Sequence, residues 1–135
     1  MHIEYMPDPN SEDIVFLKDQ LNKAASGFKS VDSFGFFIKD ENKAIKAGLD
    51  GFFMYGAIYT DQLWVAPGYR KLGLGRQLME RVHELGRAHK CAMATVSTMS
   101  FLGVQKFYEK LGYVVDFART GYANGSSCIF LSKIL

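Results

Sequence analysis

The spacing of apolar positions at the start of the chain predicts a strand followed by a helix. Residues 2–6 alternate between polar and apolar side chains, as a short strand does. From Ile14 onward, apolar residues recur at helical spacing. We therefore expect a helix that is capped by Asn10 or Ser11 and ends near Gly27.

An aromatic-rich segment then predicts a series of strands. Residues 34–39 are expected to form an aromatic strand and residues 40–43 a polar hairpin turn. Residues 44–55 and 57–65 are expected to form two further strands. Because the connections between these strands are short, we expect an antiparallel meander.

The second half of the chain alternates helices and strands. An apolar face at helical spacing between Gly75 and Gly86 predicts a helix that packs on a sheet. The later elements are expected at 91–97 (a buried strand), 104–111 (a helix), 113–117 (a strand), 119–127 (a loop) and 128–135 (a strand). A meander followed by two crossover helices implies the α/β (α+β) class, with a mixed sheet and helices on both of its faces.

The composition is typical of one compact domain over residues 1–135. Hydrophobic residues make up 48% and charged residues 22% of the sequence, and a net charge of +2 does not indicate nucleic-acid binding. No apolar run approaches the roughly 20 residues of a membrane span, and the first residues lack the features of a signal peptide. Cys91 and Cys128 fit no metal or redox spacing. We therefore expect a cytoplasmic protein with reduced cysteines, no bound metal, and neither a nucleic acid nor a membrane as partner.

A glycine-bearing turn follows the strand at 57–65. Residues 70–75 read RKLGLG and open the helix that is expected next. Backbone N–H groups at such a helix start can bind an anion, and Arg70, Lys71 and Arg76 add positive charge. The turn therefore predicts a pyrophosphate site, although a Gly-x-Gly at a strand–helix junction can also serve tight packing alone.

Two common nucleotide motifs do not match this turn. The P-loop ends in Gly-Lys-Ser/Thr, and the sequence contains no such run. The dinucleotide fingerprint needs a third glycine at the position of Leu78 and an acidic residue about 20 positions further on, where residues 93–98 contain none. A third pattern, Arg/Gln-x-x-Gly-x-Gly/Ala after a strand, fits at Arg70, Gly73 and Gly75.

This third pattern resembles the pyrophosphate loop of the GCN5-related N-acetyltransferases, the GNAT family. Residues 63–78 are similar to the family's fourth strand, loop and third helix, and residues 107–113 (FYEKLGY) resemble its second signature. The resemblance implies the GNAT fold, which is a mixed, mostly antiparallel sheet of six to seven strands whose fourth and fifth strands splay apart. It also implies an N-acetyltransferase that moves the acetyl group of acetyl-CoA directly to an amine.

The resemblance further implies where acetyl-CoA binds. The amides of the glycine turn would hold the pyrophosphate, since glycine lets phosphates approach the backbone. The pantetheine arm would lie between the strands at 57–65 and 91–97 and bond their backbone as an added strand does. The residues expected to contact the cofactor are Leu63, Trp64, Val65, Arg70, Lys71, Leu72, Gly73, Leu74, Gly75, Arg76, Ser97, Phe101 and Tyr108.

The resemblance also suggests catalytic roles. Tyr108 stands where the family often has the acid that protonates the leaving thiolate, and the alternative is that it is a core aromatic residue beside Phe107. Asp61 is expected to be the base that takes the proton of the amine, with Tyr59 and Glu109 as rivals. An amide N–H within residues 63–65 would stabilise the oxyanion.

Other features leave the acceptor open. Phe101 stands where many relatives carry an asparagine that contacts the cofactor, so the contacts at this end are expected to differ. The acceptor side is expected from residues 24–37 and 119–127, where some of the aromatic residues could line a pocket for a small amine.

His83 and His89 are expected to be structural or solvated. A non-catalytic acyl-CoA-binding or regulatory module with the same fold is the alternative, and either a monomer or a homodimer is compatible with the sequence.

Overall fold

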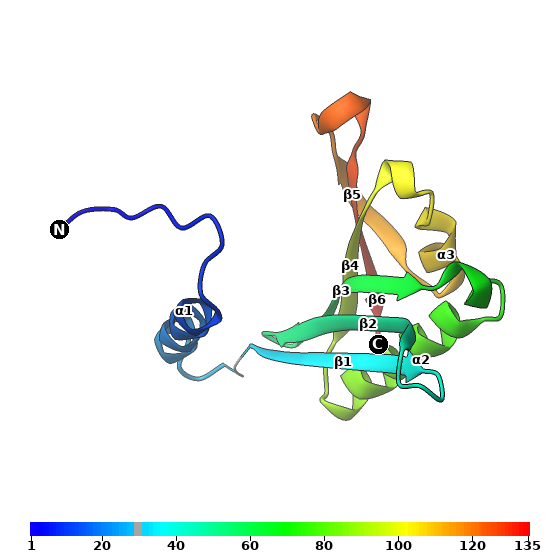
Figure 1. The fold of residues 1–135 in the computed structure, drawn as a ribbon, viewed down its shortest axis with the longest axis horizontal. Coiled ribbons are helices and arrows are strands. Elements are labelled where there is room, and N and C mark those ends of the chain that lie inside the picture. The colour runs from blue at the N-terminus through cyan, green and yellow to red at the C-terminus, as the bar shows by residue number, and fades with distance from the viewer. Residues whose placement is uncertain (29–30) are drawn as a thin grey trace.

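Six strands form one sheet, which is the body of the molecule (Figure 1). The structure is a computed structural model that describes residues 1–28 and 31–135. Its elements are α1 (Ser11–Ala24), β1 (Asp32–Lys39), β2 (Ile45–Met54), β3 (Ala57–Val65), α2 (Leu74–Ala88), β4 (Met93–Met99), α3 (Gln105–Lys110), β5 (Val114–Arg119) and β6 (Cys128–Ile134). The strand order is β1-β2-β3-β4-β6-β5, in which β3 and β4 pair in parallel and the other four neighbouring pairs are antiparallel. This is the mixed, mostly antiparallel sheet that the sequence predicts.

The N-terminal segment differs from the expectation in one element. The expected helix is α1, and the Asn10 side chain caps it by accepting a hydrogen bond from the N–H of Glu12 at 3.0 Å. The strand predicted at residues 2–6 is wrong, because these residues are exposed and form no strand. Alternation alone does not make a strand, since its backbone groups also need partners, and no strand of the described residues pairs with this segment.

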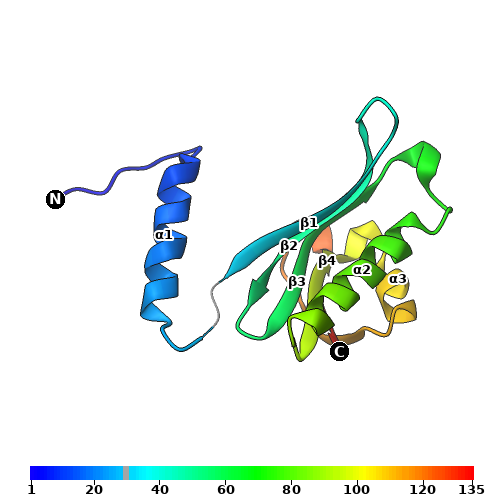
Figure 2. The same ribbon diagram turned by 90° about the horizontal axis from the view of Figure 1, so that it is seen from below.

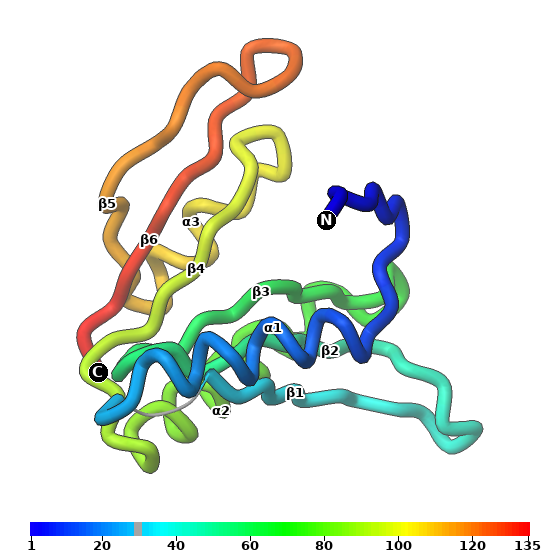
Figure 3. The backbone as a smooth tube through the Cα atoms, turned by 90° about the vertical axis from the view of Figure 1, so that its left-hand side faces the viewer, coloured from blue at the N-terminus to red at the C-terminus, as the bar shows by residue number. Residues whose placement is uncertain are grey.

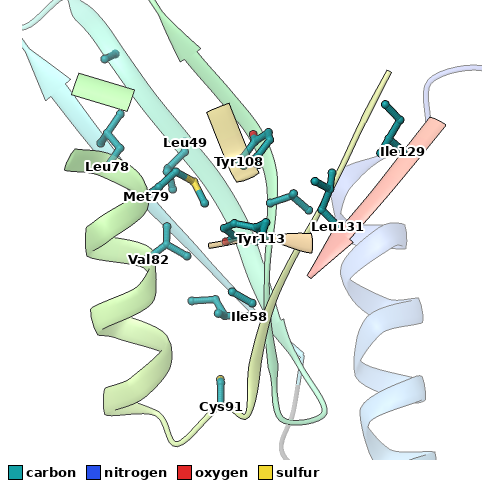
Figure 4. Packing of buried hydrophobic residues seen from close by; sticks show 13 residues of the cluster. Leu49, Ile58, Leu78, Met79, Val82, Cys91, Tyr108, Tyr113, Ile129 and Leu131 are labelled. Carbon is teal, nitrogen blue, oxygen red and sulfur yellow. The ribbon is translucent and has the colours of Figure 1, made fainter. Parts of the chain in front are cut away.

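The hydrophobic core lies between one face of the sheet and the helices α2 and α3. Figure 4 shows Met79 and Val82 of α2 pointing toward Leu49 and Ile58 of the sheet. All four of these side chains are fully buried, and each contributes about 1.5–3 kcal/mol of hydrophobic free energy. This packing fixes α2, and therefore the turn that precedes it, against the sheet.

Helix α1 lies beyond the opposite face of the sheet and stands off from it (Figure 2). None of its residues is buried, in contrast to α2. Among the described residues, no helix combines the length and the apolar character that crossing a membrane requires.

The sheet divides between β3 and β4. Their parallel pairing runs from Ala57↔Met93 to Thr60↔Val96 and then stops, although both strands continue. Figure 3 shows β4 and β6 diverging from β1, β2 and β3 beyond this point. The splayed pair that the resemblance implies is therefore present, and we call the point of divergence at Thr60 and Val96 the fork.

A β-bulge in β3 coincides with the fork. Asp50 pairs with Gln62 and Gly51 pairs with Thr60, so Asp61 is an extra residue without a partner on β2. A Cβ built on Gly51 would overlap the backbone carbonyl of Tyr59, so the close approach of the two strands requires glycine here. Because a bulge bends and twists its strand, it carries β3 away from β4.

A buried polar pair joins α2 to the segment before β5. The Nε2 atom of His83 lies 2.9 Å from the hydroxyl of Tyr113, and both residues are buried. Burial, together with the positive charges of Lys133 and Arg87, lowers the pKa of His83 to about 4. The imidazole is therefore neutral at neutral pH and has the structural role that the sequence suggests.

Replacing Gly51 with alanine should destabilise the fold, because the added methyl group overlaps backbone atoms that cannot rotate aside. We expect the free energy of unfolding, measured by urea titration, to fall by about 2 kcal/mol or more. Gly35→Ala is the matched control, since its methyl group would meet mainly the Phe37 ring, which can move. Equal stability of the Gly51 variant and the wild type would contradict the role given to this glycine.

Candidate functional site

The fork opens into a cleft of about 720 Å³. Residues 61–65 of β3 form one wall, and Ser97 and Thr98 of β4 form the other. Phe107 and Tyr108 of α3 also line it. Because the β3–β4 ladder ends at the fork, the strand edges that face each other across the cleft are not bonded to one another there.

The turn after β3 leads to the start of α2 beside this cleft. Gly73 is the N-cap of α2 and has a φ of 78°, in the left-handed region that favours glycine. No side chain caps the helix at this residue. The first N–H groups of the helix have no intrahelical acceptor, and together with the positive end of the helix dipole they are able to bind an anion.

The second glycine of the turn has a different role. Gly75 lines the cleft, and a Cβ built on it would lie 3.4 Å from the nearest atom of the Phe107 ring. That distance is an ordinary contact, so a methyl group would fit, whereas a long side chain would enter the cleft or collide with the ring. Gly73 thus supplies a backbone conformation, and Gly75 supplies space.

The basic side chains of the turn are used in different ways. The Nε of Arg70 donates a hydrogen bond to the carbonyl of Val65 at 2.8 Å, which ties the turn to the end of β3. The Nε of Arg76 lies 2.9 Å from Glu80 Oε1, so this carboxylate partly offsets its charge. Lys71 is exposed and has a positive φ of 62°. Arg70 and Lys71 therefore supply most of the positive charge at the turn.

Tyr108 is the buried titratable group of the cleft. Its side chain is 7% exposed, and its ring packs edge-on against the rings of Phe107 and Tyr113. Burial raises the pKa of the Tyr108 hydroxyl, and the nearby Tyr59 raises it further. The hydroxyl therefore keeps its proton at neutral pH and can donate it.

Polar groups also gather at the fork itself. The hydroxyls of Tyr59 and Ser97 lie 3.1 Å apart and bridge β3 and β4, and the Tyr59 ring packs against Phe52. The hydroxyl of Thr60 is buried and has no hydrogen-bond partner within the described part of the chain. An unpaired buried hydroxyl costs about 1–3 kcal/mol.

The structure brings most of the expected site residues together. The expected residues that line the cleft are Asp61, Leu63, Trp64, Val65, Arg70, Gly75, Ser97 and Tyr108. The expected residues of the adjoining turn and the first turn of α2 are Lys71, Leu72, Gly73, Leu74 and Arg76. Phe101 lies in the 3₁₀ turn Ser100–Leu102, is 72% exposed and does not line the cleft.

Several lining residues were not singled out from the sequence as ligand contacts. They are Gln62, Leu102, Val104 and Phe107. Leu102 lines the cleft where Phe101 was expected, in a turn that ends at Gly103 with a φ of 66°. Gly103 could have indicated from the sequence that Leu102 takes this place, because the glycine indicates a change of chain direction directly after residue 102.

The remaining candidates lie outside the cleft lining. Glu109 is exposed, and His83 and His89 are on or directly after α2. In the acceptor segment expected at 24–37, residues 29 and 30 are outside the described residues. Across residues 1–28 and 31–135, no group of three or more His, Cys, Asp or Glu side chains is placed to hold a metal ion.

The sequence matches a known family over most of its length. Residues 32–115 match the family described as "Acetyltransferase (GNAT) domain". This region contains β3, the glycine turn, α2 and α3, so it includes both of the motifs discussed above. No curated protein matches the chain.

Solved structures share the fold. An acetyltransferase from Bacillus cereus is 25% identical, with a TM-score of 0.78 over 100% of this chain and 98% of its own. A protein described as an acetyltransferase from Agrobacterium tumefaciens is 22% identical, with a TM-score of 0.83 over 100% of both chains. A streptothricin acetyltransferase from Bacillus anthracis, in complex with acetyl coenzyme A, is 17% identical, with a TM-score of 0.69 over 77% of this chain and 63% of its own.

Proposed function

The chain belongs to the GNAT acetyltransferase family, and on this premise we propose that it is an acetyl-CoA-dependent N-acetyltransferase in which residues 1–135 form one domain. The observation that supports the proposal is the cleft at the fork. Its lining includes Gly75, in the first turn of α2, and the buried hydroxyl-bearing residue Tyr108. A phosphate-bearing thioester needs both an anion site and an acid near its sulfur.

The cleft suits an extended ligand that carries a pyrophosphate. Beyond Thr60, the edge of β3 that faces β4 is not paired with it, so the backbone of residues 63–65 can bond to the ligand as to an added strand. The start of α2 would hold the phosphates, with Arg70 and Lys71 beside them. These features are the support for acetyl-CoA as the acetyl donor.

We propose that Asp61 and Tyr108 carry the proton transfers. Acetyl-CoA supplies a thioester, and in the reaction a C–N bond to the amine forms while the C–S bond breaks. Asp61, the exposed bulge residue at the fork, takes the proton that the amine loses, and Tyr108 gives its proton to the departing thiolate. A backbone N–H within residues 63–65 donates to the carbonyl oxygen as its negative charge develops.

The rivals for the role of base are less suitable. The hydroxyl of Tyr59 is hydrogen-bonded to Ser97, and Glu109 is exposed outside the cleft lining. Asp61 lines the cleft, which supports it as the base. The amine acceptor is proposed as a class only, and a cytoplasmic location remains a prediction from the sequence.

The proposal predicts turnover in a transfer assay. Acetyl-CoA and a panel of primary amines, from small alkylamines to peptides with free N-termini, are mixed with the protein, and released thiol is measured. We expect an amine-dependent release with at least one member of the panel. Binding of acetyl-CoA without turnover on any amine would instead favour a non-catalytic acyl-CoA-binding module.

Substituting Gly75 with glutamate should abolish cofactor binding while the fold is retained. The added side chain puts negative charge and bulk at the proposed phosphate site. We expect the affinity for CoA, measured by titration calorimetry, to fall by about 30-fold or more, which is about 2 kcal/mol. Gly68→Glu adds the same charge in the preceding turn, where a Cβ would meet nothing within 4 Å, and should bind CoA normally. Unchanged affinity in the Gly75 variant would refute the proposed phosphate site.

Replacing Tyr108 with phenylalanine should lower turnover more than cofactor affinity, because it removes the proton donor but keeps the ring. We expect kcat to fall by about 100-fold, with KM for acetyl-CoA changed by less than about threefold. Tyr113→Phe is the control, since its hydroxyl bonds to His83 and it does not line the cleft. A loss of affinity without a loss of kcat would make Tyr108 a packing residue.

A further inference from the structure

Helix α1 has an apolar stripe that none of the described residues of its own chain covers. Ile14, Leu17 and Leu21 follow one another at helical spacing and therefore share one face. Leu17 is 58% and Leu21 66% exposed. An isolated helix of 14 residues is marginal in water, so a helix of this length normally depends on packing against its apolar face.

The sheet has a complementary surface on the face opposite α2. Phe37, Gly48 and Trp64 lie directly opposite one another on β1, β2 and β3, so two aromatic side chains flank a residue without one. A groove of about 230 Å³ lies here, and Phe37 and Trp64 are 55% and 49% exposed. Since about 150 Å³ is enough for a benzene ring, the groove has room for a leucine side chain.

Two contacts hold α1 away from this surface in its own chain. The N–H of Val31 donates to the Asn22 side chain at 3.1 Å, across the turn that follows the helix. Phe28 packs edge-on against Tyr55 in the turn between β2 and β3, with ring centroids 5.9 Å apart. Bringing α1 onto its own sheet would require these two contacts to break.

The position of α1 is also supported by the match to the Agrobacterium structure. That match covers both chains completely with a TM-score of 0.83. Each residue contributes at most an equal share to the score, so the 107 residues that follow position 28 can supply at most 107/135, or about 0.79, of it. The N-terminal segment therefore contributes to the match, which indicates a similar placement in two chains of low identity.

We propose that the groove face receives α1 from a second copy of this chain, so that two copies exchange their α1 helices and form a dimer. A two-fold exchange covers both apolar surfaces and can keep the two contacts of the turn. The three side chains of the stripe, Ile14, Leu17 and Leu21, are half exposed or more. At roughly 100 Å² each, on two helices and on the surfaces they cover, they bury roughly 1,200 Å², which reaches the range of a stable dimer, roughly 1,200–2,000 Å².

The exchange would also affect the cleft. Gln62 and Trp64 line both the groove and the cleft, so the two surfaces are continuous at β3. The partner's helix would then border the cleft on the side of the sheet opposite α2.

Trp64 is the one tryptophan of the sequence, and it allows a direct test. Mass by light scattering and tryptophan emission are followed as the full-length protein is diluted. We expect a dimer at high concentration with blue-shifted emission, and a red shift that accompanies dissociation. The variant Leu17→Asp/Leu21→Asp should be monomeric with red-shifted emission at every concentration, while circular dichroism shows a folded sheet.

Val15→Asp is the matched control, because Val15 is similarly exposed but lies off the stripe on the helix surface, and this variant should dimerise normally. A monomer whose Trp64 emission is blue-shifted at all concentrations would mean that α1 docks on its own sheet and would overturn the proposal. A monomer with exposed Trp64 throughout, or a dimer that survives the double substitution, would also overturn it. None of these readouts uses enzymatic activity, so they are independent of the proposed function.

Discussion

The close approach of Gly51 to the backbone of Tyr59 is the constraint on which the site depends. It allows the bulge at Asp61, and the bulge lies where β3 ceases to pair with β4. Without that divergence, the two strands would bond along their whole length and no cleft would open between them. The absence of a side chain at Gly51 on β2 therefore allows β3 to diverge from β4.

The position of each element around the cleft follows from the packing of the core. Met79 and Val82 anchor α2 on the sheet, so its N-terminus lies at the end of the cleft where β3 finishes. Tyr108 is fixed by its aromatic neighbours, and the burial that fixes it also raises its pKa. The hydrophobic contacts that stabilise the fold thus also determine where the start of α2 and Tyr108 lie, and they keep the Tyr108 hydroxyl protonated.

Much of this arrangement could be predicted from the sequence, because it depends on local patterns. The strand at 57–65 and the helix after the glycine turn follow from periodicity and turn residues, and both are present. Residues 2–6 show why a local pattern is not sufficient, since they alternate as a strand does but have no partner strand among the described residues. The bulge at Asp61 depends on a close contact between β2 and β3 that is possible because residue 51 is glycine. Contacts between residues far apart in the chain cannot be predicted from the spacing of residue types along it.

If the cleft between β3 and β4 binds acetyl-CoA, CoA should protect the backbone amides that line it, and amide hydrogen exchange detects this protection. Exchange is measured residue by residue with and without CoA. We expect slower exchange among the amides of residues 63–65 and 72–76 when CoA is present, because these lie along the cleft and at the start of α2. Protection confined to the groove residues Phe37 and Gly48, or no protection at all under saturating CoA, would contradict it.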